Sequence, residues 1–323
     1  MLAEYLRSPI FRSMAIFGLI ATGNLLFTRI LTTKFFFDYP IVILMIQMAL
    51  TLFTIETARL FNVIKLPAYT FQRGRDLLTP SLFFSISSYL SLNCLDGSTM
   101  PIFPFVQRFA PLAIIAFLSY WHKKQRFQRN GVLIIGTICL GSAFSSIYEW
   151  SIDLWSWNYA FLALVLHALT LIHIERLQEQ YSSTIELIYL NSFNCLCLFL
   201  VADLIQDEIR DSFMYIVTST TWLFASCFFT LIVLGSLFHA ALFYCIAQAG
   251  AVHTSIMNIL AGGIQLFIAY GLSIYLFYDL YPTWTNIIGV TMTVATALYY
   301  YFKHKPIDFK NSQFSGKFLI ARA

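Results

Sequence analysis

Long apolar runs are the feature that most limits what this chain can fold into. Ten stretches of about 20 predominantly apolar residues follow one another, with short connections between them. Because a bilayer offers no water to backbone polar groups, such segments are predicted to cross it as α-helices. The predicted spans are residues 10–31, 36–58, 77–95, 99–120, 131–148, 155–175, 185–205, 219–248, 252–278 and 282–302.

Composition supports the same class of protein. Hydrophobic residues make up 59% of the 323 residues and charged residues only 11%, whereas soluble domains carry about a quarter charged residues. The net charge is +4, and the basic residues are spread over short loops. No face gathers Lys and Arg as a nucleic-acid interface does, so a nucleic-acid partner is not expected. The lipid bilayer is the expected surrounding.

The positions of Lys and Arg indicate the topology. With the N-terminus in the cytosol, sixteen of the 20 basic residues fall on the cytosolic side, and Arg29, Lys34 and Arg210 fall on the other. Arg108 remains inside a predicted span. The excess follows the positive-inside rule, which predicts an even number of crossings with both termini cytosolic.

An internal repeat relates the fourth and ninth predicted spans. At an offset of 158 residues, Gln107 aligns with Gln265 and Gly131 aligns with Gly289. The two spans run in opposite directions, so the repeat is inverted, as in many transporters. The sequence therefore predicts an all-α polytopic membrane protein of ten transmembrane helices in a five-plus-five inverted repeat. Its predicted parts are a first half at 1–150, a second half at 151–303 and a cytosolic tail at 304–323.

Proline and glycine indicate where a substrate site would lie. In inverted-repeat transporters the site lies near the midplane, where helices are interrupted. The offset places Pro104 opposite Gly262, and Gln107, Arg108 and Gln265 follow these predicted breaks. The alternative is that the breaks are packing kinks and that the glutamines join helices through hydrogen bonds.

Arg108 is the strongest single candidate, since it lies about ten residues from either end of its predicted span. An arginine at that depth costs about 3 kcal/mol or more on insertion scales, so it should face a partner or a wet cavity. Its planar, charged guanidinium suits a phosphate or carboxylate. The alternative is a structural role, in which Arg108 pairs with an acid such as Glu186 or Glu56 or with carbonyl groups at a helix end.

Other polar side chains within the spans are weaker candidates. Tyr189 and Asn191 lie in the seventh span, where an amide can read a nucleobase or cross-link helices. His253 and Asn258 begin the ninth span. Further polar residues inside spans are more often packing residues than ligands, and they are Asn24, His167 and His239.

Motifs for catalysis and metal binding do not support an enzyme. The six cysteines lie in apolar runs and form no spacing with histidine that suits zinc. No phosphate-binding loop, nucleophile elbow or pair of catalytic carboxylates is evident. We therefore expect neither a cofactor nor a metal.

Four motifs, in order over roughly residues 80–303, carry a family resemblance. Met100-Pro101-Ile102-Phe103 followed by Gln107-Arg108-Phe109 is similar to an LPMF…RRF run, and Thr283-Trp284-Thr285-Asn286 followed by Ile288-Gly289 is similar to TWTNFIG. Tyr189-Leu190-Asn191 and Gly262-Gly263-Ile264-Gln265-Leu266 stand where the family has FYN and GALNK. The chain thus resembles the nucleotide-sugar transporters of the drug/metabolite transporter superfamily, in particular the UDP-sugar branch.

The resemblance implies a multi-pass protein of the Golgi or endoplasmic reticulum membrane. It would exchange a UDP-linked nucleotide sugar for a nucleoside monophosphate by alternating access. Tyr189 and Asn191 would help to read the base, the segment around Gln265 would meet the phosphates and sugar, and Arg108 would contribute charge. A homodimer is left open.

The departures from the family keep two alternatives open. The family's ninth-helix lysine is absent at Gln265-Leu266, and the first basic position of the fourth-helix pair is Gln107. A diphosphate should bind less tightly to a site with fewer cations. The alternatives are a transporter of another small metabolite with the same fold, or a membrane partner protein that does not transport.

Overall fold

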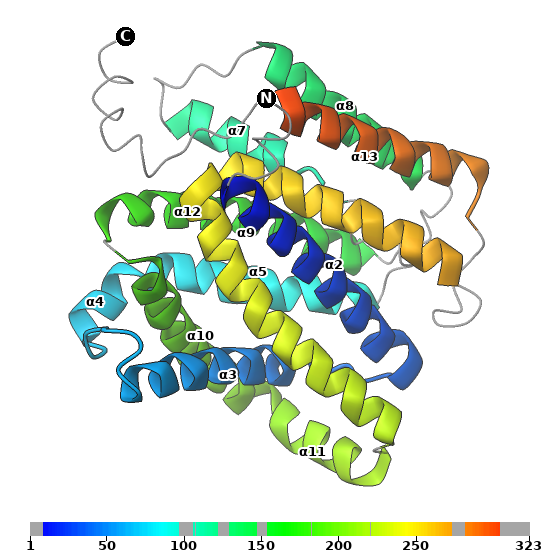
Figure 1. Ribbon diagram of the computed structural model, residues 1–323. Coiled ribbons are helices and arrows are strands. Elements are labelled where there is room, and N and C mark those ends of the chain that lie inside the picture. The colour runs from blue at the N-terminus through cyan, green and yellow to red at the C-terminus, as the bar shows by residue number, and fades with distance from the viewer. Residues whose placement is uncertain are drawn as a thin grey trace.

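The computed structural model describes residues 9–96, 106, 108–121, 129–146, 154–181, 183–219, 221–272 and 282–303. Over these residues the chain forms eleven helices and no strand (Figure 1). The helices are α2 (Pro9–Phe35), α3 (Pro40–Leu60), α4 (Phe71–Asp76), α5 (Leu78–Asp96), α7 (Ala110–Trp121), α8 (Arg129–Ser145), α9 (Leu154–Gln180), α10 (Thr184–Gln206), α11 (Glu208–Ser219), α12 (Trp222–Leu272) and α13 (Trp284–Lys303).

The chain is an all-helical, multi-pass membrane protein. Within the described ranges, five helices are long and apolar enough to cross a bilayer, and they are Phe11–Phe35, Pro40–Leu60, Leu154–Gln178, Thr184–Gln206 and Trp222–Leu272. Each of the ten predicted spans overlaps a helix, and the eighth and ninth spans both lie in α12. The count of ten crossings and the inverted repeat stay predictions.

Gly250 divides α12 into two parts that run in different directions (Figure 1). Its φ of 80° and ψ of 169° are reached readily only by glycine, because a Cβ atom is strained at such a positive φ. The sequence placed the boundary between the eighth and ninth spans at this point. A single glycine thus supplies the whole turn.

The predicted break at Gly262 and Gly263 is wrong. In the structure α12 stays helical from Ala251 to Leu272, and both glycines are buried within it. Their use is close packing, since a Cβ atom on Gly263 would lie 2.4 Å from Cγ2 of Val294 on α13. Glycine at a helix contact lets two backbones approach without breaking either helix.

The fourth predicted span contains a turn in its described part. Arg108 and Phe109 form a turn, and α7 begins at Ala110. Pro111 lies in the first turn of α7, where its missing N–H costs no helical hydrogen bond. Arg108 therefore lies in a turn within its predicted span, and Val106 before it is helical. The predicted break at Pro104 lies outside the described residues.

Contacts between helix ends show how the chain runs. Near the start of α2, the ring of Phe11 lies 6.3 Å from that of Tyr301 near the end of α13. At the other end of α2, the hydroxyl of Tyr215 on α11 donates to the carbonyl oxygen of Phe35. The start of α2 and the end of α13 therefore lie on the same side of the bundle. An even number of crossings, such as the ten predicted, requires this arrangement.

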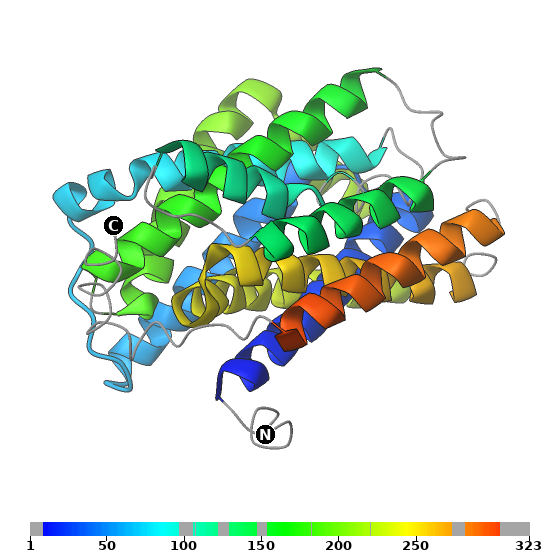
Figure 2. The same ribbon diagram turned by 90° about the horizontal axis from the view of Figure 1, so that it is seen from above.

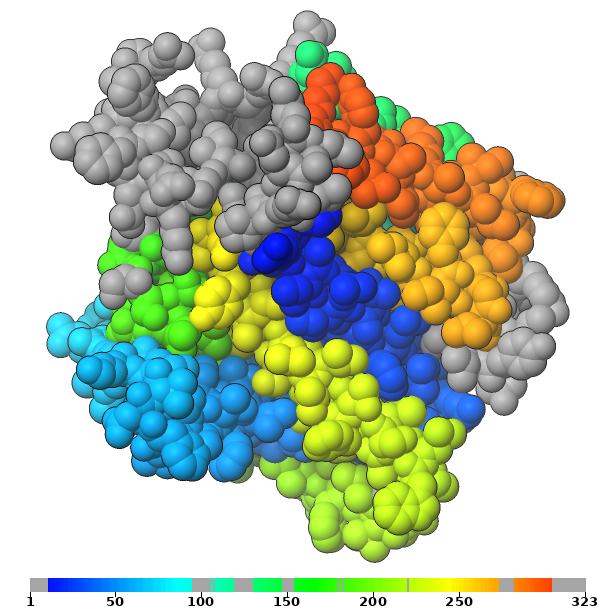
Figure 3. All heavy atoms as spheres, viewed as in Figure 1, coloured from blue at the N-terminus to red at the C-terminus, as the bar shows by residue number. Residues whose placement is uncertain are grey.

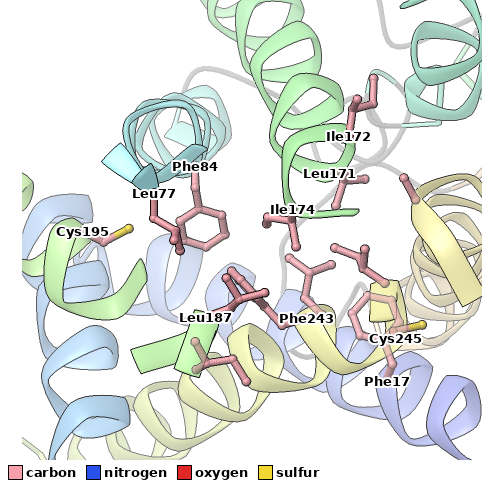
Figure 4. Packing of buried hydrophobic residues seen from close by; sticks show 14 of the residues in the cluster. Phe17, Leu77, Phe84, Leu171, Ile172, Ile174, Leu187, Cys195, Phe243 and Cys245 are labelled. Carbon is pink, nitrogen blue, oxygen red and sulfur yellow. The ribbon is translucent and has the colours of Figure 1, made fainter. Parts of the chain in front are cut away.

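Four helix pairs make up most of the packing. α2 lies along α12, where Phe17 stacks on Phe238 with ring centroids 5.5 Å apart, and the two helices are side by side on the face in Figure 3. α5 pairs with α9 and α3 with α10, while α8 and α13 run together (Figures 1 and 2). Figure 4 shows the central apolar cluster between them, in which Phe84, Leu187 and Phe243 meet.

The α8–α13 pair is the tightest of these contacts. A Cβ atom on Gly289 would lie 2.3 Å from the backbone nitrogen of Ser145, and one on Gly141 would lie 2.8 Å from Oγ1 of Thr293. Small residues at such crossings allow close van der Waals contact, which drives helix association in lipid.

Candidate functional site

A cavity of about 110 Å³ lies among α2, α3, α5, α9 and α12. Its apolar lining includes Phe84 and Phe238. Its polar lining consists of neutral side chains, namely Asn24, Thr28, Gln47, Ser87, Ser88, Ser91, His167, His239 and Asn258. Helices from both predicted halves therefore enclose it.

The cavity lies midway along the bundle. His167 is at the centre of α9, and Asn24 is close to the centre of α2. Asn258 enters from the second part of α12, and His239 enters from the first. Because these helices span the bilayer, a cavity at their centres lies at midplane depth, where transporter sites are usual.

The cavity wall carries hydrogen-bonding groups without fixed charge. None of the described residues that line it is Lys, Arg, Asp or Glu. Amides and hydroxyls both donate and accept hydrogen bonds, and neutral imidazole does the same through its two nitrogens. Such a wall can bind uncharged polar groups and offers no permanent cation to a phosphate.

Asn191 lies behind this wall and not on it. Its Oδ1 accepts a hydrogen bond from Ser81 Oγ on α5 at 2.8 Å, and its Nδ2 lies 2.9 Å from Nε2 of His239 on α12. With the amide nitrogen as donor, His239 Nε2 is the acceptor and its proton lies on Nδ1, 3.4 Å from Ser192 Oγ. The side chain of Asn191 is fully buried and joins three helices.

Tyr189 and its neighbours join α10 to α3 and α4. The Tyr189 hydroxyl donates to Glu56 Oε1 at 2.6 Å. Asn194 Nδ2 donates to the carbonyl oxygen of Gly74 at 2.9 Å, and its Oδ1 accepts from Tyr69 at 2.9 Å. Of the two roles weighed for Tyr189 and Asn191, helix cross-linking is the one that this conformation displays.

Arg108 belongs to a separate network. Its side chain is 1% exposed, and Nη1 donates to Ser145 Oγ at 3.1 Å, at the last residue of α8. Asn286, near the start of α13, donates from Nδ2 to the carbonyl oxygen of the same Ser145 at 2.6 Å. The network thus links the turn before α7 to the α8–α13 pair.

The two acids proposed as structural partners of Arg108 pair with other arginines. Glu186 Oε1 lies 3.3 Å from Arg73, and Glu56 Oε1 lies 3.3 Å from Arg59. The alternative of an ion pair between Arg108 and either acid is therefore wrong in this conformation.

The remaining predicted residues are dispersed along α12. Gln265 is 2% exposed, Gly262 is buried beside Gly263, and the ring of His253 lies 5.9 Å from that of Tyr300. Gln107 lies outside the described residues. Among the predicted site residues that the structure describes, Asn258 alone lines the cavity, and Asn191 reaches it through His239.

Several lining residues were not predicted as site residues. Gln47 on α3 and the serines of α5 face the cavity, with Ser87, Ser88 and Ser91 on one side of their helix. Their spacing of one and four positions is a signal for a polar helix face. Arg29, which lies near the end of the first predicted span, is 5% exposed within α2, because α2 continues to Phe35.

Comparisons with known proteins agree on a class. No protein-family model matches the chain. The chain is similar to UDP-galactose/UDP-glucose transporter 7 of Arabidopsis thaliana, with 23% identity over 221 residues, which cover 66% of this chain and 68% of that protein. It is also similar to UDP-sugar transporter sqv-7 of Caenorhabditis elegans, with 21% identity over 304 residues, which cover 91% of this chain and 89% of that protein.

A solved crystal structure shares the fold. It superposes with a TM-score of 0.54 at 13% sequence identity, over 87% of this chain and 94% of that one. Together with the two sequence relatives, and with the order of motifs from residue 80 onward, this similarity extends over most of the chain. The chain is therefore a distant homologue of two proteins named as UDP-sugar transporters.

Proposed function

We propose that this protein carries a nucleotide sugar, UDP-linked, across a Golgi or endoplasmic reticulum membrane in exchange for a nucleoside monophosphate. The observation that carries the proposal is the similarity to a UDP-sugar transporter over 91% of the chain. The central cavity between helices of both predicted halves supports it, because substrates of inverted-repeat transporters bind at such a place.

The pattern of helix packing supports a five-plus-five repeat with halves at 1–150 and 151–303. An exchange of halves relates α2 to α9, α3 to α10, α5 to the first part of α12, and α8 to α13. If each helix is replaced by its counterpart in the other half, the contact between α2 and α12 corresponds to the contact between α9 and α5. The same replacement leaves the contacts α3–α10 and α8–α13 unchanged. All four contacts are observed. Two such halves can exchange conformations and give alternating access.

The size of the cavity implies a conformational change during transport. Sites for drug-sized ligands are typically about 300–1,000 Å³, well above the 110 Å³ found here. A whole nucleotide sugar therefore requires an open state. The bonds from α10 to α3 and α4, through Tyr189–Glu56 and Glu186–Arg73, are the proposed latches that separate when the cytosolic side opens.

The predicted site residues have proposed roles in that open state. Arg108 and Gln107, just before α7, and Gln265, beside Gly262 on α12, are proposed to bind the phosphates. Tyr189 and Asn191 are proposed to read the base once α10 moves, with His253 and Asn258 completing the site. The burial of Arg108 and Gln265 supports this reading, since both point away from lipid.

A second candidate function is transport of a less charged metabolite. The observation in its favour is the cavity wall, whose described residues include no cation to balance a diphosphate. Both candidates predict movement of a solute, so transport assays separate them by substrate.

The test uses the full chain, purified and reconstituted in liposomes. Radiolabelled UDP-glucose and UDP-galactose should enter rapidly when UMP is preloaded and at least tenfold more slowly when it is not. Arg108→Ala should abolish uptake, with Arg210→Ala as the control, because Arg210 is exposed and pairs only weakly with Asp207 at 3.7 Å.

Three results would change the conclusion. If UDP-sugars enter equally fast with and without preloaded UMP, an exchange mechanism is excluded. Uptake of an uncharged metabolite without uptake of any UDP-sugar would favour the second candidate. Absence of all uptake and of any nucleotide-induced thermal shift would indicate a partner protein that does not transport.

A further inference from the structure

Two amide side chains and one imidazole in the cavity wall have no hydrogen-bond partner among the described residues. Asn24 on α2, His167 on α9 and Asn258 on α12 all line the cavity. Across the described ranges, none of the three side chains makes a hydrogen bond, and Oδ1 of Asn24 is buried from solvent. They come from three helices and converge at midplane depth.

Unpaired polar groups at this depth need a reason. A buried acceptor without a partner costs about 1–3 kcal/mol, and buried polar groups in native proteins are usually satisfied. Helix cross-linking is not the reason here, because a cross-linking amide in this bundle, such as Asn191, is bonded at both ends. A ligand that enters the cavity can supply the missing partners.

The chemistry of the wall defines the kind of ligand. The described lining is uncharged, so it matches groups that carry no charge. Two amides and an imidazole offer both donors and acceptors, which match hydroxyl groups because these also donate and accept. Phe84 and Phe238 add apolar surface for the C–H face of a ring.

The size of the cavity points to a single ring. An engineered cavity of about 150 Å³ in another protein binds benzene, so 110 Å³ is on the scale of one six-membered ring and not of a nucleotide sugar. We infer that Asn24, His167 and Asn258 form the subsite for the uncharged, hydroxyl-bearing glycosyl group of the substrate. The nucleotide part then binds outside this subsite. The inference rests on the proposed function and assigns one part of the substrate to one part of the molecule.

The test compares two ligands and two kinds of residue. Asn24→Leu and Asn258→Leu keep the size of the side chain and remove its hydrogen-bonding groups. Thr230→Val is the control, because the Thr230 hydroxyl is exposed and bonds its own helix at the carbonyl oxygen of Ser226. Binding and uptake of UDP-glucose and UDP-galactose are compared with those of UMP, which has the same nucleoside but lacks the glucosyl or galactosyl group.

Each asparagine variant should weaken binding of the UDP-sugars about tenfold, as expected for one lost hydrogen bond of about 1.4 kcal/mol. Binding of UMP should change less than twofold. The melting temperature of the ligand-free protein should stay the same or rise, because an unpaired polar group has been removed. Thr230→Val should leave all these values unchanged.

Several results would overturn the inference. Equal losses for UMP and the UDP-sugars would assign the residues to the nucleotide, and no loss for either would remove them from the site. Failure of Asn24→Leu to fold would also count against the subsite, since Asn24 is inferred to have no structural partner. In that case Asn258→Leu would be used for the comparison of UMP with the UDP-sugars. Wild-type protein that binds neither ligand would overturn the proposed function itself, whereas wild-type binding with unaffected variants would overturn the subsite alone.

Discussion

Asparagine side chains have opposite surroundings in two neighbouring regions of this bundle. On α10, Asn191 and Asn194 are bonded to α5, α12 and α4. In the cavity, Asn24 and Asn258 make no side-chain hydrogen bond within the described part of the chain. The difference teaches that an amide inside a membrane protein is informative about function only when its partners are known. Three predictions test these two regions, from the largest expected effect to the smallest, and a fourth concerns a carboxyl group outside them.

Asn191→Leu should destabilise the protein by about 2 kcal/mol, because it leaves Ser81 and His239 buried without their partner. The same replacement at Asn24 should cost nothing. Unfolding of both variants in mixed micelles, followed by tryptophan fluorescence and circular dichroism, measures the difference. Equal losses at the two positions would erase the contrast between the regions.

Gly235→Ala should reduce both stability and transport. Its new Cβ atom would lie 2.0 Å from Nε2 of Gln47, which lines the cavity, so the amide must shift. Displacing a buried side chain costs about 1.5 kcal/mol, and the shift should raise the KM for uptake severalfold. A combined Gly235→Ala and Gln47→Ala variant should recover most of the stability. A KM equal to that of the wild type would show that this part of the wall does not meet substrate.

Tyr189→Phe should lower the stability by about 1 kcal/mol, because it removes the hydrogen bond to Glu56 and keeps the buried ring. Tyr244→Phe is the matched control, since the Tyr244 hydroxyl makes no hydrogen bond to any described residue and its ring is partly exposed. Unfolding midpoints in detergent measure both. A loss of the same size in the control would mean that the Tyr189–Glu56 contact contributes nothing.

Glu208 lies outside both regions, on α11, and should make stability depend on pH. Burial raises the pKa of this carboxyl group to about 7, although the N–H of Ile41, which donates to Oε2 at 2.8 Å, favours the charged form. The folded state therefore keeps the proton that the unfolded state loses near pH 4.5, so stability should fall as the pH rises from about 4.5 to 7. Solvent screening limits this fall to about 1 kcal/mol.

Glu208→Gln should remove that dependence, because an amide does not titrate over this range. Melting temperatures of the two proteins at pH 5 and pH 8 provide the measurement. The wild type should melt at a lower temperature at pH 8 than at pH 5, and the variant should melt at similar temperatures. A variant with the full wild-type dependence would assign the effect to another group.

The positions of the helices were predictable from local sequence. All ten predicted spans overlap helices, and the turn between the last two spans of α12 falls at Gly250. The predicted break at Gly262 and Gly263 was wrong, because α12 stays helical there and Gly263 packs against Val294. Hydropathy cannot distinguish these uses, since both place a glycine in an apolar run.

The site was predictable only in small part. Asn258 lines the cavity as part of a predicted site, but Gln47 and Ser88 were not expected there, and Arg108 is bonded to Ser145 away from the cavity. Spacing along one helix shows which residues share a face. It does not show whether that face meets lipid, another helix or a cavity.

The sequence by itself determined that the chain crosses a membrane many times as helices, because burial of backbone groups in lipid depends on local apolar length. Only the tertiary structure decided which polar side chains are paired. The partners of Asn191 are on α5 and α12, far away in the sequence, whereas Asn24 faces a cavity and receives no hydrogen bond from a described side chain. Pairing depends on how distant helices pack, and that is where a structural amide and a ligand-binding amide become different.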